Sequence, residues 1–402
     1  MSLLSYDASQ DMLELLDVGV IKHERVPLTL SLGRVLATDI VADENEPKFL
    51  TASMDGYAIK FEDQVLKTIK VLGDNPAGND ANMSIDSGES IKTFTGSKMP
   101  IGADTLIPIE LVSFENDTIT INEEVAKGYA TRAVAESFAK GDVLISKGTK
   151  IGFVEVGVMA SLNVVMVDVV LKPRVSIIST GSEILDLGEC SQNEAKIRSS
   201  NNYTLAALIE QAGAASVQLG TTTDDKDEIY EAFLNALNSS DIIITTGGVS
   251  VGDYDFVKDV VLKLGAEVLF KGVAIKPGKH ILVAKKGTKF IFSLPGFAYS
   301  STITAILYVL PIVAKMLGKN RAYKTIEAKL SEEFKKRSNL SEFSACNLVL
   351  ESGAYEVNFD GKKVGSSAIL TNMLNGSAIL KTSPEDGDLE AGTMVSVIVL
   401  DV

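Results

Sequence analysis

The sequence predicts a multidomain protein in which a doubly wound α/β domain lies between β-rich segments. Three observations support this prediction. The chain has 402 residues, enough for two to four domains at about 150 residues each. From Lys172 onward, strand-like and helix-like segments alternate, as in a parallel or mixed sheet covered by helices. Residues 43–135 and 320–402 instead contain short β-type runs between Gly, Asn and Asp clusters.

The first 171 residues predict a helix, a β module and a mixed segment, in that order. Residues 1–42 have helical spacing of apolar positions and then a short extended piece that begins at Pro27. Residues 43–135 are typical of a small all-β module. Its strands are expected at 57–59, 68–72, 91–94 and 118–121. Residues 136–171 return to mixed sequence punctuated by glycine.

The α/β segment is the clearest part of the sequence. Strands are expected at 174–179, 216–219, 241–245 and 267–270, and helices at about 201–213, 225–237 and 256–264. Residues 290–314 form an uncharged run, and this run is long enough to suggest a membrane span. Pro295 and Gly296 divide this run, so we expect a buried strand at 290–294, a turn and a buried helix. Residues 320–402 predict a final β domain.

Composition excludes several classes of function. The chain has 38 basic and 53 acidic side chains and a net charge of −15, so unspecific binding to nucleic acid or to an anionic membrane is not expected. Any anion site needs local positive charge or a metal ion. Two cysteines and two histidines are too few for a zinc finger, an iron–sulfur cluster or a disulfide scaffold. The N-terminus carries acids where an export signal needs bases, so we expect a cytoplasmic protein.

The strongest chemical motif is TTGGVSVGDYD (245–255), which follows a predicted strand. Small residues there allow backbone N–H groups to converge on an oxyanion: Gly247, Gly248, Ser250 and Gly252. Asp253 and Asp255 suit a Mg²⁺ ion that bridges to a phosphate, or they cap the next helix. The run is neither a Walker A motif nor a dinucleotide fingerprint.

Three further loops of the α/β segment are candidates, and two of them, STGSE and SLPG, end strands of the predicted sheet. STGSE (179–183) places Thr180, Gly181 and Glu183 at the same edge as the glycine run, although an exposed loop glutamate is the favoured explanation for Glu183 taken alone. KPGKH (276–280) holds two ammonium groups, which either bind a dianion or are simply solvated. SLPG (293–296) either lines a pocket or only turns the chain.

Two loops in the β module are weaker candidates. SMDGYA (53–58) contains Asp55, a lone acid in an uncharged stretch, and Gly56, which permits close backbone approach; an Asp-Gly turn explains both almost as well. The loop 94–104 contains Thr95 and is only suggestive. No Ser/His/Asp or Cys/His triad can be assembled, because His23 lies in a charged segment and His280 in the lysine loop.

Together these motifs resemble those of the MoeA family, the molybdopterin molybdenumtransferases, whose fold also forms the larger (E) domain of gephyrin. The matching segments run in order along essentially the whole chain: SMDGYA (53–58), FTGSKMPIGAD (94–104), STGSE (179–183), TTGGVSVGDYD (245–255), KPGKH (276–280), SLPG (293–296) and GSSAILTNMLNGSAIL (365–380). SMDGYA followed by TGGVSVG is the specific part of the match.

The resemblance implies four domains in a homodimer. Residues 1–42 with 136–171 correspond to an elongated N-terminal domain, and 43–135 to a β domain inserted into it. Residues 172–319 correspond to an α/β molybdopterin-binding-like domain and 320–402 to a C-terminal β-barrel-like domain. In the family the cleft lies between the α/β domain of one subunit and the inserted β domain of the other.

The implied activity belongs to molybdenum cofactor biosynthesis. The substrates are adenylylated molybdopterin and molybdate; molybdenum enters at the dithiolene, the adenylyl–phosphate bond is hydrolysed, and AMP is released with the help of Mg²⁺. Family positions tied to activity are Asp55, Thr95 and Glu183. Residues expected to hold the cofactor are Thr180, Gly181, Gly247, Gly248, Ser250, Gly252, Lys276, Lys279 and Pro295. Carboxylates expected to hold the metal are Asp253, Asp255 and Glu183. Further implied partners are the adenylyltransferase of the same pathway and apo-molybdoenzymes.

The sequence departs from the family pattern at three places. Ser199 follows Arg198 where the family has Asp, Ala135-Glu136-Ser137 stands for Gly-Glu-Asp, and Phe297-Ala298 stands for Asn-Pro. Two alternatives therefore stay open beside the molybdenum-inserting enzyme. One is a non-catalytic pterin-binding scaffold for cofactor delivery, and the other is insertion of tungstate, which has the same charge and nearly the same size as molybdate.

Overall fold

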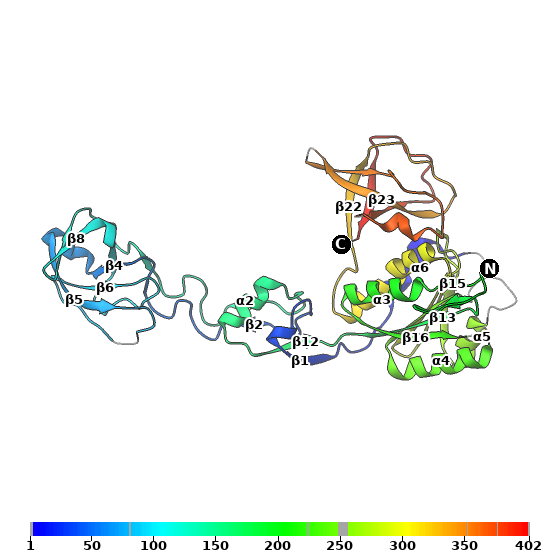
Figure 1. Cartoon of the computed structure of the whole chain (residues 1–402), viewed down its shortest axis with the longest axis horizontal. Coiled ribbons are helices and arrows are strands. Elements are labelled where there is room, and N and C mark those ends of the chain that lie inside the picture. Colours follow the sequence, from blue (N-terminus) through cyan, green and yellow to red (C-terminus); the bar gives the residue numbers. More distant parts are fainter. Residues whose placement is uncertain are drawn as a thin grey trace. The chain divides into compact units, whose positions relative to one another are not determined.

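The computed structural model describes residues 3–79, 82–222, 225–247, 256–351, 353–375 and 377–400. The chain forms two compact units (Figure 1). The large unit comprises Met1–Val26, Gly33–Ala37 and Asp168–Val402, and the small unit comprises Pro27–Leu32 and Thr38–Val167. The bounds of the four predicted domains stay a proposal.

A six-stranded mixed sheet is the centre of the large unit. Its order is β16 (Ala215–Thr222), β13 (Arg174–Thr180), β17 (Ile242–Thr246), β21 (Lys289–Leu294), β20 (Leu282–Lys286) and β18 (Glu267–Lys271). The first four strands are parallel, whereas β20 and β18 are antiparallel to their neighbours. The chain leaves β13 toward β16 and returns to β17 on the other side, so a topological switch point lies between β13 and β17. Ligands of such sheets bind beyond the carboxyl ends of the strands at this point.

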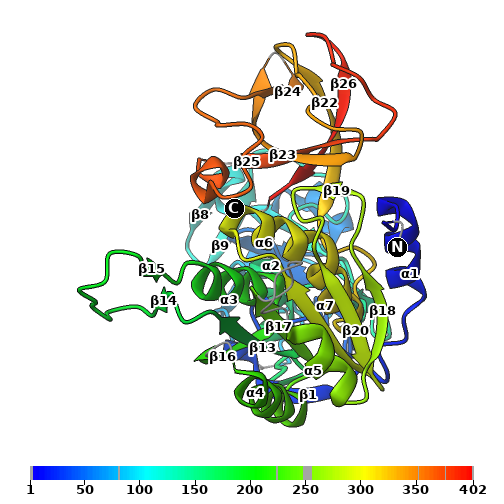
Figure 2. The ribbon, with the colours of Figure 1, turned by 90° about the vertical axis from the view of Figure 1, so that its right-hand side faces the viewer.

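Helices cover both faces of this sheet, as Figure 2 shows. One face packs against α3 (Asn201–Ala212), α6 (Ala298–Thr304), the π-helical turn η4 (Ala305–Val309) and α7 (Leu310–Met316), and the other against α4 (Lys226–Ser239) and α5 (Val257–Lys263). Local signals set the helix ends: Gly213 ends α3 at φ +97°, and the Asp225 side chain caps α4 by accepting from the N–H groups of Asp227 and Glu228.

The N-terminal helix α1 (Tyr6–Leu15) packs into the same apolar core as α6, η4 and α7. Pro311 lacks an N–H, so the carbonyl of Leu307 loses its helical donor; Gln10 Nε2 of α1 donates to that oxygen at 3.2 Å. Ser9 and Tyr308 form a second polar contact, 2.9 Å between their hydroxyl oxygens. Both contacts tie the first helix to the centre of the large unit.

The chain ends in a closed five-stranded β barrel. Its strands are β22 (Lys324–Leu330), β23 (Ser341–Glu351), β24 (Ala354–Asn358), β25 (Ser377–Thr382) and β26 (Met394–Val399), with a 3₁₀ turn η5 (Leu370–Met373). Pairing of β23 with β25 closes the barrel, and the two-residue strand β19 (Ile275–Lys276) adds to β23. Strand β19 therefore joins the α/β layer to the barrel.

The small unit contains a six-stranded sheet and shorter pairs. The sheet order is β7 (Thr105–Pro108), β4 (Gly56–Ile59), β6 (Glu89–Thr93), β5 (Thr68–Asn75), β9 (Thr118–Ile121) and β8 (Val112–Glu115). The remaining elements are β2 (Ile40–Val41) with β11 (Val143–Ile145), β3 (Thr51–Ala52) with β10 (Thr131–Arg132), α2 (Phe153–Ser161) and the turns η1 (Leu28–Leu30), η2 (Phe61–Leu66) and η3 (Ile109–Leu111). Strands β1 (His23–Pro27) and β12 (Met166–Val170) pair at the boundary between the units.

These elements confirm the predicted fold class, a doubly wound α/β domain with β domains around it. They also confirm the buried interpretation of residues 290–314. Among the described residues, one helical run, Ala298–Met316, could cross a membrane by length and composition, yet 83% of its apolar window is buried within the protein. It is the core helix of the large unit.

Candidate active site

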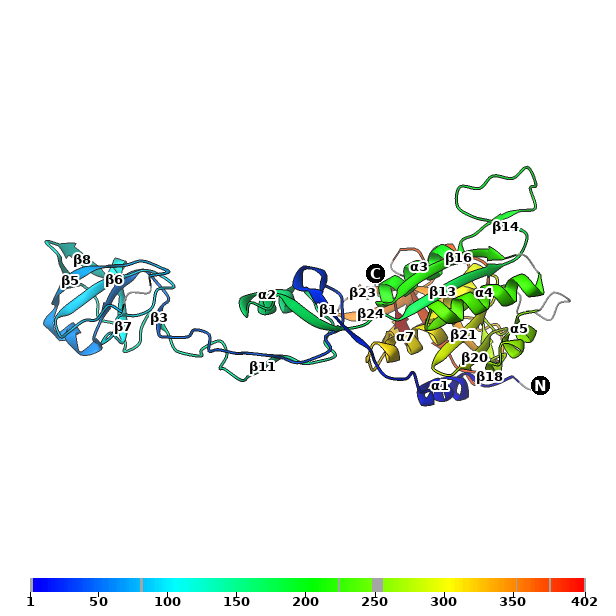
Figure 3. The same cartoon turned by 90° about the horizontal axis from the view of Figure 1, so that it is seen from below.

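The carboxyl ends of β13, β17 and β21 surround a cavity of about 550 Å³, here called the switch-point cavity. Four segments and one loop histidine contribute to its walls: Ser179, Thr180 and Glu183 at and beyond the end of β13; Arg198, Ser199, Ser200 and Asn201 before and in α3; Thr246 and Gly247 at the end of β17; Pro295, Gly296, Phe297 and Ala298 between β21 and the start of α6; and His280. The short parallel pair β14 (Ile184–Leu185) and β15 (Ile197–Arg198) bounds an excursion of the chain that projects from the α/β layer in Figure 3.

Two glycines allow the strand ends to approach closely. Gly247 has φ +89°, and a Cβ there would lie 2.9 Å from the carbonyl oxygen of Thr180. Gly181 has φ +135°, and a Cβ there would lie 2.6 Å from a carboxylate oxygen of Glu183. At Gly247 the positive φ and the backbone carbonyl both disfavour a side chain, whereas at Gly181 the neighbour is an exposed side chain and the positive φ is the reason. A part of the glycine pattern is therefore explained by the backbone alone.

A buried hydroxyl network lies beneath the cavity and joins β13 to β17. Ser179 Oγ donates to Asn202 Oδ1 and lies 3.2 Å from Thr246 Oγ1, and Thr180 Oγ1 donates to the Thr246 carbonyl at 3.3 Å. These bonds hold the floor of the cavity in one arrangement. In the wall, Ser199 Oγ is buried and has no hydrogen-bond partner among the described residues.

The first turn of α3 faces the cavity. Ser200 is the N-cap residue, but its side chain makes no capping hydrogen bond, and Asn201 Nδ2 instead donates to the Gly296 carbonyl at 2.8 Å. Capping therefore does not account for this Ser-Ser-Asn run. The first amide groups of a helix and its dipole favour an anion, and α3 presents them at a cavity that also holds small polar side chains.

The structure brings together four predicted residues of the large unit: Thr180, Glu183, Gly247 and Pro295 all line the switch-point cavity. Gly181 lies between the first two and is buried. The other predicted residues of the glycine loop lie outside the described residues: Gly248, Ser250, Gly252, Asp253 and Asp255.

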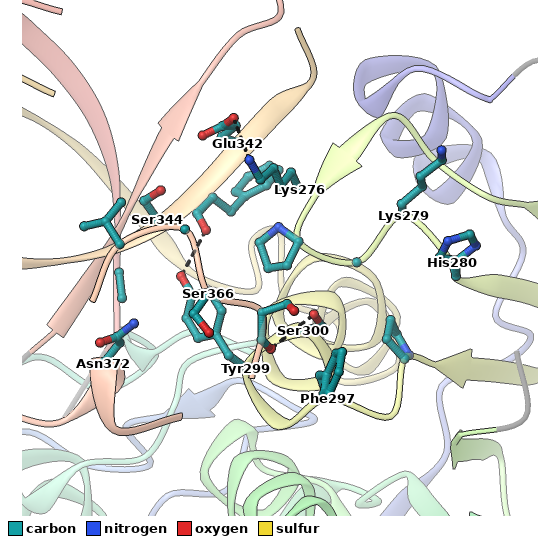
Figure 4. A pocket seen from close by; sticks show the side chains of 18 residues that line it. Lys276, Lys279, His280, Phe297, Tyr299, Ser300, Glu342, Ser344, Ser366 and Asn372 are labelled. Atoms are coloured by element: carbon teal, nitrogen blue, oxygen red, sulfur yellow. Dashed lines mark hydrogen bonds and ion pairs between the residues drawn. The ribbon is translucent and has the colours of Figure 1, made fainter. Parts of the chain in front are cut away.

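A second cavity of about 340 Å³, here called the loop cavity, lies between the KPGKH loop and the barrel (Figure 4). Lys276 Nζ lies 3.6 Å from Glu342 Oε1 and donates to the Arg337 carbonyl at 3.4 Å. Figure 4 shows Lys279 directed away from this pair. The two lysines thus line one cavity, but their side chains do not converge on one point.

Glu342 is a site residue that the motifs did not reveal. Its side chain is 5% exposed, and its Oε1 accepts from Ser338 Oγ at 2.6 Å and from the Arg337 N–H at 3.1 Å. It is the register partner of Lys276 in the β19–β23 pair. The sequence signal was present, since Glu342 is a lone acid in an uncharged stretch, as Asp55 is.

The two cavities share three lining residues, His280, Pro295 and Phe297. Phe297 is 63% exposed and follows the SLPG turn directly. Gly278 sets the course of the loop between the cavities: it has φ +103°, and a Cβ there would lie 2.3 Å from Cγ2 of Thr304 in α6. The cavities are therefore neighbours along one continuous wall.

In the small unit, Asp55 and Thr95 form a hydrogen-bonded pair. The N–H and the hydroxyl of Thr95 donate to Asp55 Oδ1 at 2.8 and 2.7 Å. These two bonds, the backbone one first, hold the pKa of the exposed Asp55 carboxyl below its ordinary value. Asp55 is thus a stable surface anion. Gly56 beside it has no room for a side chain, because a Cβ would lie 2.3 Å from the Ile107 carbonyl oxygen.

The departure at 135–137 has a structural consequence. Ala135 has φ +61°, a left-handed conformation that suits the glycine of the family pattern better. Glu136 is engaged locally, since Arg132 Nε lies 2.9 Å from its Oε1. Ser137 donates its N–H to the Glu46 carbonyl at 2.8 Å and supplies no carboxylate.

The donor set at the switch-point cavity fits Mg²⁺ bound with a phosphate. Among the described residues, no group of three or more His, Cys, Asp or Glu side chains could hold a metal ion. Mg²⁺ does not need such a cage, because it commonly binds through one or two carboxylates and substrate phosphates. Glu183 provides one exposed carboxylate beside the cavity.

Comparison with known families and proteins covers nearly the whole chain. The family described as "MoeA N-terminal region (domain I and II)" matches residues 4–163, and the "Probable molybdopterin binding domain" matches residues 176–315. The molybdopterin molybdenumtransferase of Haemophilus influenzae is 30% identical over 389 residues, with 93% of each chain covered. That of a Nostoc species is 31% identical over 363 residues, covering 88% of this chain and 82% of the relative.

Solved structures agree with these relatives. A molybdopterin biosynthesis MoeA protein from Pyrococcus horikosii superposes with a TM-score of 0.85 at 26% identity, with 99% of each chain covered. A second structure, of the MoeA protein from Pyrococcus horikoshii OT3, has a TM-score of 0.82 at 30% identity and covers 99% of this chain and 100% of that one.

Proposed function

Because the chain belongs to the MoeA family of molybdopterin molybdenumtransferases, we propose that it inserts molybdenum from molybdate into adenylylated molybdopterin and releases AMP. The observation that carries this proposal is the switch-point cavity together with the loop cavity, which shares three of its lining residues. One is walled by the start of a helix and by small polar side chains, and the other contains lysines. A substrate with a pyrophosphate and a second, separate anion needs such an arrangement.

The switch-point cavity is proposed to hold the pyrophosphate. Backbone amides at the start of α3 and along the Gly247 turn offer donors to phosphate oxygens, and the dipole of α3 adds positive potential. Thr180 and Pro295 shape this wall. The predicted contributions of Gly181, Gly248, Ser250 and Gly252 remain part of the proposal.

The loop cavity is proposed to hold molybdate near Lys279 and Lys276. Glu342 offsets the charge of Lys276 at 3.6 Å, so Lys279, which is exposed, is expected to contribute most of the attraction to a dianion. The two lysines are therefore expected to contribute unequally, whereas the sequence suggested two equivalent cations around one anion.

Mg²⁺ is proposed to be held by Glu183 together with Asp253 and Asp255. When bound, such an ion screens the charge of the phosphates and stabilises the leaving oxygen. Asp55 and Thr95 are proposed as the contribution of the inserted β domain, where Thr95 keeps the Asp55 carboxylate ionised.

A homodimer is proposed, with a partner subunit supplying the Asp55 segment to the cleft. The small unit carries an exposed apolar face that supports this proposal. Turn η1 packs against α2, and large apolar side chains around them are exposed: Leu30, Leu32, Phe153, Val154 and Val165. Such a face is typical of a surface that a partner covers. A cytoplasmic location is proposed from the acidic composition.

The test is release of AMP from adenylylated molybdopterin with Mg²⁺ and micromolar molybdate. We expect molybdate-dependent release by the wild type and a loss of at least about 100-fold in Asp55→Ala, as for removal of a charged catalytic group. Asp43→Ala, an exposed aspartate of the same unit outside the SMDGYA segment, is the matched control and should keep its activity. Tight pterin binding without AMP release would favour the scaffold. Equal AMP release with tungstate in place of molybdate would favour tungstate insertion.

A further inference from the structure

We infer that Phe297 is a stacking surface for a flat heteroaromatic ring of the substrate, either the adenine or the pterin. This inference rests on the proposed function, because it assigns a ring-binding residue to the same site. The chemistry that the structure singles out is an exposed aromatic side chain at the border of two cavities.

The first observation is the exposure of Phe297 directly before a buried helical run. Phe297 is 63% exposed, whereas every residue from Tyr299 to Leu310 is buried. Leaving a phenylalanine in water forgoes the free energy that burial of its ring would provide. A ligand ring laid against it recovers that apolar contact.

The second observation is that the backbone fixes this residue. Phe297 is the N-cap of α6 with φ −69° and ψ 132°, and its carbonyl accepts the Ser301 N–H at 2.8 Å. The preceding carbonyl, of Gly296, accepts from Asn201 Nδ2 at 2.8 Å. The ring is thus carried by a backbone that is held on both sides.

The third observation is the position of the ring. Phe297 lines both the switch-point cavity and the loop cavity, together with His280 and Pro295. In Figure 4 it lies on the opposite side of the loop cavity from Glu342. A ring stacked there would sit between the polar start of α3 and the lysine loop, which are proposed to hold the two anions.

Stacking of a base on an aromatic side chain contributes about 1–3 kcal/mol, or roughly 5- to 150-fold in affinity, and tolerates different ring systems because every base has a π face. Asparagine at this position, as in the family pattern, has no such face. The effect of Phe297 should therefore depend on whether the ligand contains an aromatic ring, and it should not depend on the phosphate.

The experiment measures calorimetric binding of three probes, AMP, ribose 5-phosphate and 6-hydroxymethylpterin, to the full-length wild type and to variants. Phe297→Asn should weaken AMP or the pterin about tenfold and leave ribose 5-phosphate unchanged, while Phe297→Tyr should keep wild-type affinity. Loss for AMP alone assigns the adenine to Phe297, and loss for the pterin alone assigns the pterin. Leu350→Asn is the control, because Leu350 is 64% exposed on β23 and lines neither cavity.

The inference is overturned if Phe297→Asn binds all three probes as the wild type does. The AMP-release assay separates this failure from failure of the proposed function. Unchanged binding by Phe297→Asn with intact AMP release by the wild type would remove the stacking role alone. A wild type that neither binds the ring-containing probes nor releases AMP would overturn both.

Discussion

Replacing Gly278 by alanine should disturb the KPGKH loop and destabilise the large unit by about 3 kcal/mol. A Cβ at this position would lie 2.3 Å from Thr304 Cγ2 and 3.3 Å from Ile275 Cδ1, with φ at +103°. Overpacking of this kind costs about 2 kcal/mol. The positive φ adds about 1.5 kcal/mol for a residue with a Cβ, and the lower entropy of the unfolded alanine chain offsets roughly 0.7 kcal/mol.

The steric part of this cost depends on one methyl group, so a second substitution can remove it. Thr304→Ser deletes Cγ2 but keeps the hydroxyl, which donates to the Ser300 carbonyl at 2.8 Å. Alone it should cost about 0.8 kcal/mol, the value of one buried methyl. In the double variant the clash is gone, so the total should be about 1.6 kcal/mol instead of the additive 3.6 or so, a coupling of about 2 kcal/mol.

The assay is unfolding followed by circular dichroism at 222 nm and by scanning calorimetry, since the chain has no tryptophan. About 3 kcal/mol corresponds to a fall in Tm of roughly 6–12 °C for a unit of this size. Additive destabilisation in the double variant would refute the steric reasoning, because it would mean that the Thr304 methyl does not limit the space at residue 278. Wild-type stability of Gly278→Ala would refute the conformational argument as well.

Three other predictions concern the small unit. Thr95→Val removes one of two hydrogen bonds that depress the pKa of Asp55, so that pKa should rise. A depressed pKa stabilises the fold above the unfolded-state pKa, and this contribution is lost as pH falls through the folded-state pKa. In the variant the contribution should therefore be smaller, and its loss should be complete at a higher pH. A ¹³C NMR titration checks this, and an unmoved midpoint would contradict it. Gly56→Ala should lower stability by about 2 kcal/mol, because its Cβ would meet the rigid carbonyl of Ile107; a wild-type Tm would show that the strands can separate at no cost. Ala135→Gly should raise stability by about 0.5 kcal/mol, since relief of the left-handed conformation exceeds the entropy cost of glycine, and a lower Tm would show the reverse.

The α/β core could be predicted because its strands are buried on both faces and end at glycines or small polar residues. The strand expected at 241–245 is Ile242–Thr246, and the one at 290–294 is Lys289–Leu294. Because Val, Ile and Phe are continuous in such strands, the predicted strand bounds differ little from the observed ones. The two-residue strand β19 could not be predicted, because its pairing with β23 depends on long-range register and leaves no period in the sequence.

The candidate site could be predicted in outline but not in its pairings. The strand-end motifs pointed to one edge of the sheet, and Thr180, Glu183 and Gly247 do meet there. The partner of Lys276 was hidden, because Glu342 lies on a distant strand and reaches the lysine only when β19 joins the barrel. The spacing of two lysines around a turn suggested one shared anion site, whereas the left-handed Gly278 between them directs Lys279 elsewhere.

Several glycines of the motifs are required by close packing, so their presence is weaker evidence for catalysis than the motifs suggest. Gly56, Gly181, Gly247 and Gly278 each occupy a position where a Cβ would come within 3.0 Å of another atom. At Gly56, Gly247 and Gly278 the neighbour is a backbone carbonyl or the buried Thr304, so these three glycines serve the fold whether the protein catalyses a reaction or only binds a pterin. The residues that can separate an enzyme from a scaffold are the exposed side chains beside those glycines, namely Asp55, Glu183 and Lys279. Glu183 and Lys279 are exposed, and Asp55 is exposed but hydrogen-bonded to Thr95. A loss of activity that greatly exceeds any loss of stability in their alanine variants is the evidence that would favour the enzyme.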